Sequence, residues 1–224
     1  MNNTRRTKDL LYEQVARIGK AASSPKRLEL IELLCQGEKT VETLAREASI
    51  SLKLASAHLR ELRAGNLVET ERHGKHIAYR LADRTVADFW VSIRSLAEER
   101  LVELQLALQK IAAAPNDLVP SDRETLMKAA RRGEVVVLDV RPTDEYLTTH
   151  LPFARSIPID ELRQRLAELP KDRPVVAYCR GPFCLMAKDA VDLLRKEGYS
   201  AAHLRDGVAE WGMAPVAARI SGAV

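Results

Sequence analysis

The first half of the chain repeats apolar residues every three or four positions, which is the spacing of amphipathic helices. This repeat predicts four consecutive helices over residues 11–22, 25–37, 41–48 and 52–64. Ser24 and Pro25 form a pair that is typical of a helix N-cap and first turn. Thr40 is a second N-cap, and Gly65 is expected to end the fourth helix. The pattern indicates a small helical domain.

The third and fourth predicted helices are joined by a tight turn at residues 49–51, as in a helix-turn-helix whose second helix enters the major groove of DNA. Ala55, Leu59 and Leu62 share one face of the fourth helix. The opposite face is basic, small and hydrogen-bonding, and such side chains contact phosphates and guanine edges. An ordinary solvated face is the alternative. The candidate DNA contacts are Ser51, Lys53, Ser56, His58 and Arg60, with packing as the alternative role of His58.

Residues 67–81 alternate apolar and polar positions around a His73-Gly74 turn, which predicts a two-stranded hairpin. A basic hairpin beside a recognition helix is expected to lie along DNA phosphates, with an affinity that falls steeply with salt. The predicted apolar face holds Ile77, Tyr79 and Leu81, and the candidate phosphate contacts of this wing are Arg72, Lys75 and Arg80.

A long amphipathic helix is predicted after Asp83, its expected N-cap, because apolar residues keep helical steps from Val86 to Ile111. A stripe of that length exceeds what a small domain can cover. We therefore expect a partner helix from a second copy of the chain. The alternative is that the stripe packs only on the second domain.

Charge separates the two halves of the 224-residue chain. Residues 1–114 hold 19 Lys and Arg against 15 Asp and Glu, and residues 115–224 hold 16 of each, so the net charge of +4 lies in the first half. A nucleic-acid surface is expected there. Pro115 and Pro120 interrupt the helical pattern. We therefore expect a DNA-binding and dimerisation domain over 1–114, a linker over 115–120 and a second domain over 121–224.

The chain shows neither an apolar run of membrane-spanning length nor the hydrophobic core of a signal peptide. We therefore expect a cytoplasmic protein with no membrane partner. Three cysteines in that compartment are expected to be reactive or free rather than a disulfide framework.

The second half alternates apolar strand-like runs with helical segments, which is the pattern of a parallel sheet covered on both faces. Strands are expected at residues 135–139, 156–158, 174–178 and 201–204, with a short helix at 162–169 and a longer one ended by Gly198. Cys179 follows the strand at 174–178. It is therefore expected at the carboxyl end of a central strand, where such sheets bind ligands.

Cys179 is expected in a tight loop facing a helix N-terminus, whose amides carry partial positive charge. Together with the charge of Arg180, these amides should lower the thiol pKa from about 8.5 toward neutrality and make the sulfur nucleophilic. The alternative is a buried, inert cysteine. Cys184 closes the same loop, and it either resolves an oxidised Cys179 or packs as a small apolar residue.

The first half resembles the winged helix-turn-helix repressors of the ArsR/SmtB family. The motifs are Pro25-Lys-Arg-Leu, Val41-x-x-Leu-Ala, the run from Ala55 to Val68 and Gly74-Lys-x-x-x-Tyr-Arg-Leu. The resemblance implies homodimers, formed by the first and last helices, that bind imperfect inverted repeats of double-stranded DNA and are released by an inducer.

The metal ligands of that family are missing, since residues 41–48 hold no Cys and residues 86–114 hold no His or Cys. We therefore expect no metal. Cys35 is similar to one thiol of the family's persulfide-sensing members, but the last helix has no second thiol to join it. We interpret Cys35 as a core residue, with a sensor role as the alternative.

The second half resembles the rhodanese family. The motifs are Leu138-Asp-Val-Arg-x-x-x-Glu-Tyr, His150-Leu-Pro-x-Ala-x-Ser-Ile-Pro, Tyr178-Cys-Arg-Gly and Gly207-Val-x-x-Trp. The resemblance implies that Cys179 carries sulfur as a persulfide held by the loop amides. It also implies that Asp139, Arg141 and Glu145 support the sheet end and the loop.

Two departures from that family lower the expected turnover of thiosulfate. Cys184 stands where active single-domain members usually have an arginine or another polar residue. Pro182 removes one amide donor from the loop. A slower, donor-specific persulfidation that is passed to or resolved by Cys184 fits these residues better.

The predicted fold is an α+β winged helix-turn-helix domain followed by an α/β rhodanese-like domain with a central parallel sheet. The functional hypothesis is a dimeric transcriptional regulator, expected to repress, that responds to sulfane sulfur or thiol oxidants through Cys179 without a cofactor. Modification of Cys179 would change contacts between the rhodanese module and the long last helix. Two alternatives stay open: a sulfurtransferase acting on thiosulfate or persulfide with an accessory DNA-binding domain, and a regulator that binds an oxyanion such as arsenate or arsenite.

Overall fold

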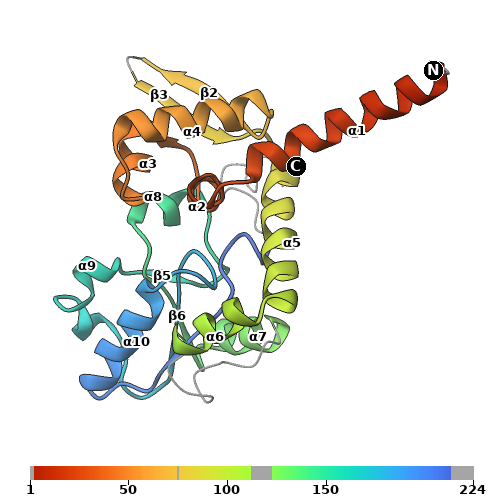
Figure 1. The fold of residues 1–224 in the computed structure, drawn as a ribbon. Coiled ribbons are helices and arrows are strands. Elements are labelled where there is room, and N and C mark those ends of the chain that lie inside the picture. Colours follow the sequence, from red (N-terminus) through yellow and green to blue (C-terminus); the bar gives the residue numbers. More distant parts are fainter. Residues whose placement is uncertain (1–2, 75, 112–122, 213–224) are drawn as a thin grey trace, which may run out of the picture. The chain divides into compact units, whose positions relative to one another are not determined.

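The computed structural model describes residues 3–74, 76–111 and 123–212 (Figure 1). The chain divides into two compact units, Met1–Ser92 and Ile93–Val224. This division falls inside helix α5 (Arg84–Arg100), and the linker expected at residues 115–120 lies outside the described residues. Within the described ranges, no helix combines the length and apolar character needed to cross a bilayer.

The first unit combines helices with a small three-stranded sheet. Its elements are α1 (Asn3–Ala22), α2 (Pro25–Leu34), β1 (Lys39–Thr40), α3 (Val41–Glu47), α4 (Leu52–Ala64), β2 (Val68–His73), β3 (His76–Leu81) and the start of α5. The four predicted helices are confirmed, although α1 begins earlier and α2 ends before Gly37. Leucine and isoleucine side chains of α2, α3 and α4 form its core, namely Leu30, Ile31, Leu44, Leu59 and Leu62.

Two helix starts follow the capping signals of the sequence. The Thr40 hydroxyl accepts a hydrogen bond from the Thr43 amide at 3.3 Å, and the Ser51 hydroxyl accepts one from the Leu54 amide at 3.2 Å. Ser24 stands at the N-cap of α2 with an extended backbone, but its side chain makes no capping hydrogen bond. The first turn of α2 therefore relies on its proline rather than on a side-chain cap.

Helix α4 ends at Gly65, as predicted, but the left-handed residue is the one that follows, Asn66. Gly65 has φ −83°, whereas Asn66 has φ +55°. The amides of Asn66 and Leu67 bond back to carbonyls of the last helical turn at 2.9 and 3.0 Å, which is a Schellman motif. Asparagine tolerates this backbone region better than most residues. A glycine is needed at position 65 because there is no room for a side chain: a Cβ there would lie 2.6 Å from the Cβ of Ala21.

The predicted hairpin is present, but the prediction that His73 belongs to the turn was wrong. β2 and β3 pair from Val68↔Leu81 to His73↔His76, so His73 belongs to the paired strands. Ala78 is buried, whereas Ile77 is exposed. Alternate residues of a strand face opposite sides, so Ile77, Tyr79 and Leu81 share one face, as predicted, and Tyr79 and Leu81 are half-buried there. The short strand β1, which was not predicted, pairs with β3.

The single long helix predicted after Asp83 is two helices. Asp83 caps α5, and hydrogen bonds from Thr85 hold the pKa of the Asp83 carboxyl below its ordinary value. α5 ends before Leu101, and α6 (Val102–Ile111) follows it. The side-chain amide of Gln105 donates to the Glu98 carbonyl at 2.7 Å, which supplies a partner to a carbonyl at the end of α5.

The second unit contains the end of α5, α6 and a layered α/β structure. The further elements are α7 (Arg123–Arg132), β4 (Val136–Asp139), α8 (Thr143–Thr148), β5 (Arg155–Ser156), α9 (Ile159–Leu162), the 3-10 helix η1 (Leu166–Glu168), β6 (Val175–Tyr178), α10 (Met186–Lys196) and β7 (Ala201–His203). The four predicted strands are confirmed, and they pair in parallel in the order β5-β4-β6-β7. The helix predicted over 162–169 is wrong, because Pro158 starts α9 earlier and a separate turn, η1, follows it.

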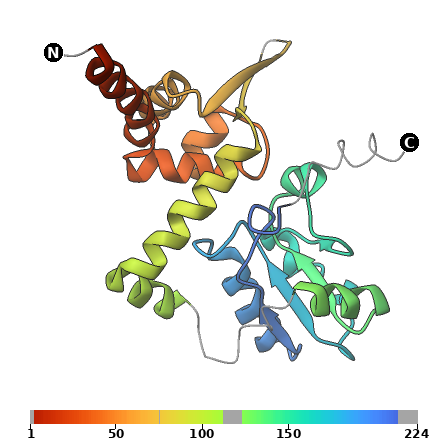
Figure 2. The same cartoon turned by 90° about the vertical axis from the view of Figure 1, so that its right-hand side faces the viewer.

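Alternate residues of β4 and β6 face two separate cores. One core holds Leu138, Val175 and Ala177 with residues of α10, and the other holds Val137, Val176 and Tyr178 with Leu126 of α7. Figure 2 shows α7 in green and α10 in blue on opposite sides of the strands. Cover on both faces explains why these strands are apolar runs in the sequence. The carboxyl ends of β4 and β6 meet at one edge of the sheet.

Replacement of Gly65 tests the contact between the end of α4 and α1. Gly65→Ala is expected to lower the free energy of unfolding by about 1–3 kcal/mol, because the added methyl group overlaps Ala21. Gly19→Ala is the matched control, since a Cβ there meets no atom within 4 Å. Removing this helical glycine should raise the free energy of unfolding by about 0.5–1 kcal/mol. Urea denaturation of the full chain measures both, and an equal effect of the two changes would contradict the contact.

Candidate functional site

The loop between β6 and α10 carries the two cysteines that the sequence suggested as reactive. Cys179 follows the fully buried strand β6, and Cys184 precedes Leu185, the N-cap of α10. The Cys184 amide donates to the Gly181 carbonyl at 3.1 Å and closes a turn. Gly181 has φ +147°, a backbone conformation that favours glycine. The loop thus brings both cysteines to the start of a helix.

Cys179 and Cys184 are joined as a disulfide, with a separation of 6.4 Å between their Cα atoms. This separation falls in the usual range of about 4.4–6.8 Å. Cys179 is only 1% exposed, whereas Cys184 is partly buried. The sequence suggested an exposed Cys179 thiol. The structure instead buries Cys179 in its bonded form and leaves Cys184 as the more exposed of the two.

A buried ion pair joins the carboxyl ends of β4 and β6. Asp139 binds Arg141 at 2.6 Å, and the Tyr178 hydroxyl donates to Asp139. Burial by itself would lower the pKa of Arg141, but the hydrogen bonds and charge of Asp139 hold that pKa above its usual value. Burial and the negative charge of Asp139 raise the pKa of Tyr178. Arg141 therefore stays charged and Tyr178 stays protonated, so the group forms a fixed frame beside the loop.

Arg180, which follows Cys179, binds a carboxylate on the neighbouring helix. Its guanidinium lies 2.6 Å from Glu145 of α8, whose side chain is buried. Arg141 approaches the same carboxylate at 4.0 Å. The positive charge of Arg180 is therefore balanced by a neighbouring carboxylate, which reduces the help that it can give a Cys179 thiolate. The amides at the start of α10 are a further source of positive potential at the loop.

Three residues outside the predicted site set lie against the loop. A Cβ at Gly207 would lie 2.5 Å from the Arg180 carbonyl oxygen, so the loop backbone packs directly on this glycine. The Gly207 amide donates to Glu210 at 2.7 Å, and Glu210 pairs with Arg94 of α5 at 2.6 Å. Gly207 had a signal in the sequence as part of the Gly-Val-x-x-Trp motif. Glu210 and Arg94 had none, because their contact spans 116 positions of sequence.

Of the candidate DNA contacts on α4, Lys53 and Arg60 lie on the face opposite its buried residues, and His58 lies to the side of that face. Ala55, Leu59 and Leu62 are buried, as predicted. Ser51 is exposed at the helix start, where its hydroxyl oxygen caps α4. Of the remaining candidates, Lys53 and Arg60 are exposed, and Ser56 and His58 are half-buried.

The wing carries more balanced charge than the sequence suggested. Arg80 pairs with Glu69 at 2.7 Å and approaches Glu71 at 3.6 Å. Arg72 donates to the Gly74 carbonyl at 3.0 Å, so it binds a backbone oxygen rather than a carboxylate. Lys75 lies outside the described residues. Of the two described arginines of the wing, Arg80 is therefore paired with carboxylates, whereas Arg72 is bound to a backbone carbonyl.

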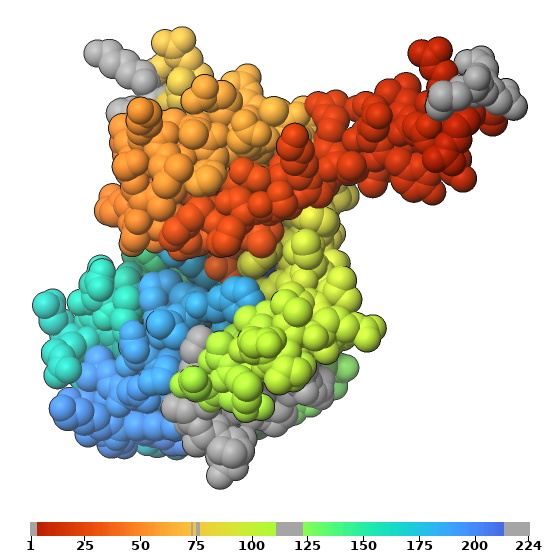
Figure 3. All heavy atoms as spheres, viewed as in Figure 1, coloured from red at the N-terminus to blue at the C-terminus, as the bar shows by residue number. Residues whose placement is uncertain are grey.

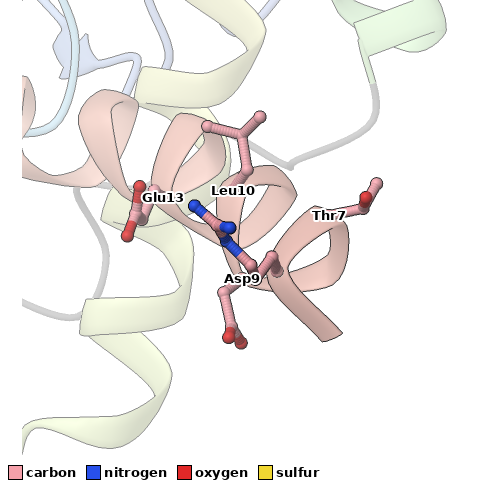
Figure 4. Close-up of a pocket in the computed structure, with 5 residues that line it drawn as sticks. Thr7, Asp9, Leu10 and Glu13 are labelled. Atoms are coloured by element: carbon pink, nitrogen blue, oxygen red, sulfur yellow. The ribbon is translucent and has the colours of Figure 1, made fainter. Parts of the chain in front are cut away.

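Helix α1 exposes much of its surface. Leu11, Tyr12 and Val15 are each more than half exposed, and Figure 3 shows the first part of this helix, in red, projecting beyond the other helices of its unit. Figure 4 shows a hollow along α1 whose labelled residues are Thr7, Asp9, Leu10 and Glu13. Residues of one helix alone line this hollow, so it is open surface rather than an enclosed ligand site.

The remaining chemical candidates give no metal site. Among residues 3–74, 76–111 and 123–212, no group of three or more His, Cys, Asp or Glu side chains is close enough to hold a metal ion. Cys35 is the C-cap residue of α2 and is partly buried. The other two cysteines, Cys179 and Cys184, lie in the loop after β6.

Comparisons with known proteins match both units. Residues 24–70 match the model of bacterial regulatory proteins of the arsR family, and residues 122–214 match the rhodanese-like domain. The HTH-type transcriptional regulator Rv0324 of Mycobacterium tuberculosis is 42% identical over 207 residues, which are 92% of this chain and 91% of that protein. A sulfurtransferase of Allochromatium vinosum is 33% identical over 92 residues, which are 40% of this chain and 84% of that protein.

Among solved structures, the homodimeric winged helix-turn-helix DNA-binding domain of a possible ArsR-family regulator from Mycobacterium bovis is 41% identical, with a TM-score of 0.41. It covers 43% of this chain, and the match spans 89% of that domain. The two family matches and the similarity to Rv0324 confirm both resemblances seen in the sequence. This chain therefore belongs to the ArsR family of transcriptional regulators, in the form that also carries a rhodanese-like domain.

Proposed function

We propose that this protein is a repressor whose operator affinity responds to sulfane sulfur or thiol oxidants through Cys179 and Cys184. The observation that carries the proposal is the approach of these two cysteines within one loop, at the carboxyl end of β6 and the start of α10. The proposed compartment is the cytoplasm, which keeps thiols reduced. The reduced loop is then the resting state, and the disulfide is the signal.

The proposed chemistry has two steps. The Cys179 thiolate attacks the outer sulfur of a persulfide R–S–S–H, which forms Cys179–S–S–H and releases R–S⁻. The Cys184 thiolate then attacks the inner sulfur of that persulfide, forms the disulfide with Cys179 and releases HS⁻. The two cysteine sulfurs lose two electrons, and the transferred sulfur atom gains them as it leaves as hydrosulfide.

The surroundings of the loop favour this chemistry over rapid thiosulfate turnover. The N-terminal end of α10 stabilises a thiolate. A doubly charged oxyanion such as thiosulfate needs further donors or cations, but Arg180 is bound to Glu145 and Pro182 has no amide proton. We therefore assign Arg180, with Asp139 and Arg141, to the positioning of the loop.

The proposed DNA surface combines the exposed face of α4 with the wing, and the operator is an inverted repeat bound by a homodimer. Support for the dimer comes from α1, whose exposed apolar side chains form a surface suited to a second copy. These side chains are Leu10, Leu11, Tyr12, Val15 and Ile18.

The sulfur chemistry can be followed by mass spectrometry of the full-length protein after treatment with polysulfide. The wild type should end as the Cys179–Cys184 disulfide. Cys184→Ser should accumulate one added sulfur on Cys179, because the second step no longer has its nucleophile. Cys179→Ser should gain no sulfur in the loop, and Cys35→Ser is the control that should behave as the wild type. Persulfide on Cys184 in the Cys179→Ser variant would contradict the assigned order.

The regulatory step can be measured as operator affinity in gel shifts with and without polysulfide. We expect affinity of the wild type to fall by about tenfold or more on treatment, in line with typical allosteric coupling. Affinity of Cys179→Ser should stay unchanged. Equal affinity of the wild type and the variant under both conditions would remove the switch and leave a DNA-binding protein.

The DNA surface can be tested by the salt dependence of operator binding. Lys53→Gln, Arg60→Gln and Arg72→Gln should each weaken binding and reduce the slope of log affinity against log salt by about 0.9 for every phosphate that the side chain neutralises in the wild type. Arg80→Gln should have a smaller effect, because Arg80 is already paired with Glu69. Arg163→Gln removes an equal charge from the C-cap of α9, in the second unit, and should leave the slope unchanged.

A further inference from the structure

We propose that the buried ion pair between Arg94 and Glu210 links the redox state of the Cys179–Cys184 loop to helix α5. This inference rests on the proposed function of that loop. Both residues belong to the unit Ile93–Val224, and their side chains are 4% and 5% exposed. Arg94 Nη1 lies 2.6 Å from Glu210 Oε1. The pair has a positioning role, because it acts on the loop through Gly181 and Gly207 and takes no part in the reaction at the sulfur atoms.

The ion pair is in contact with the middle of the cysteine loop. A Cβ at Gly181 would lie 3.3 Å from Glu210 Oε1 and 3.5 Å from Arg94 Nη1, so both charged groups rest against this glycine. The guanidinium carbon of Arg94 lies 5.8 Å from the centre of the Phe183 ring. Gly181 and Phe183 both stand between the two cysteines. A change at the cysteines therefore reaches the ion pair through the residues that they enclose.

A second contact ties the pair to the backbone beside Cys179. Glu210 Oε2 accepts the Gly207 amide at 2.7 Å. Gly207 in turn packs on the carbonyl groups of Cys179 and Arg180, where a Cβ would approach to 2.7 and 2.5 Å. Glu210 therefore contacts Gly181, which lies within the loop, and Gly207, which packs on the backbone of Cys179 and Arg180. A shift of the Cys179 backbone changes the position of Gly207 and, with it, that of the carboxylate.

On its other side, the pair is anchored along α5. Arg94 Nε lies 3.2 Å from Glu98 Oε1, one helical turn later, and Glu98 also pairs with Arg205. Two successive turns of α5 are thus bound to the segment 205–210. α5 is continuous from Arg84, which belongs to the first unit, to Arg100. The contact therefore acts on the helix that begins in the DNA-binding unit.

Burial makes this pair a firm link. Separation of a buried ion pair leaves two uncompensated charges in a medium of low dielectric, which is more costly than a small shift of the whole group. Formation of the disulfide requires Cys179 and Cys184 to approach and constrains the enclosed residues. We therefore expect α5 to follow the loop, rather than the ion pair to break.

The coupling can be tested by hydrogen exchange of the full-length protein, reduced by dithiothreitol or oxidised by diamide. Diamide forms the disulfide without a sulfur donor. In the wild type, amides of residues 94–100 should differ by about threefold or more in exchange rate between the two states. Glu210→Gln and Arg94→Met should abolish this difference while the disulfide still forms, as shown by mass spectrometry. Arg94→Lys, which keeps a cation opposite Glu210, should retain most of it.

Asp192→Asn is the matched control. It removes one negative charge from an exposed pair with Lys188 on α10, and it should keep the wild-type difference. An unchanged α5 in the oxidised wild type, or a full response in Glu210→Gln, overturns the coupling. Operator affinity separates this inference from the proposed function. If α5 responds to diamide but operator affinity does not, the coupling stands and the proposed switch of DNA binding fails.

Discussion

The ion pair between Asp139 and Arg141 is the constraint on which the functional edge of the parallel sheet depends. Both side chains are fully buried, and a charge removed from water must find a partner of opposite sign. Loss of either partner would leave the other uncompensated, at a cost of about 3–5 kcal/mol. Arg141 also donates to the Thr149 carbonyl, and Tyr178 joins Asp139 to the Leu151 amide. The pair therefore fixes the ends of β4 and β6 and the segment around Thr149 and Leu151, which lies between these strands in the sequence.

This frame separates residues that are fixed by buried ion pairs from the loop segment between the two cysteines. Arg180 is fastened to Glu145 and so belongs to the fixed residues, although it is the nearest neighbour of Cys179 in the chain. The segment from Gly181 to Phe183 contains a glycine in an unusual backbone conformation and lies between the cysteines. A change at sulfur therefore acts first on Gly181 and Phe183, which lie against Arg94 and Glu210.

Much of the fold could be predicted from the sequence because its signals are local. Helical spacing, the caps at Thr40 and Asp83, and apolar strand runs each depend on neighbouring residues. The predicted turn of the wing wrongly included His73, because a His-Gly pair is compatible with a hairpin turn, whereas the strand pairing extends to His73. The break at Leu101 was missed because neither glycine nor proline marks it.

The candidate site was harder to predict than the fold, because its contacts join residues that are far apart in the sequence. Cys179 and Cys184 could be found from their place after a strand and before a helix. The binding of Arg180 by Glu145 changed the expected electrostatics, because a partner 35 positions away leaves no local pattern. Arg94 and Glu210 are still farther apart in sequence, and each alone is an ordinary charged residue. Their pairing is decided by tertiary packing, which periodicity and motif spacing do not report.

The division of the chain inside α5 has a consequence for how such proteins are assembled from parts. The rhodanese-like match begins at residue 122, yet the buried carboxylate of Glu210 takes its cation from residue 94. A rhodanese-like module that began at residue 122 would contain the buried carboxylate of Glu210 without its counter-ion, Arg94. Recombination that keeps this ion pair must therefore move the connecting helix together with the rhodanese-like module, so the inherited piece is larger than the recognisable domain.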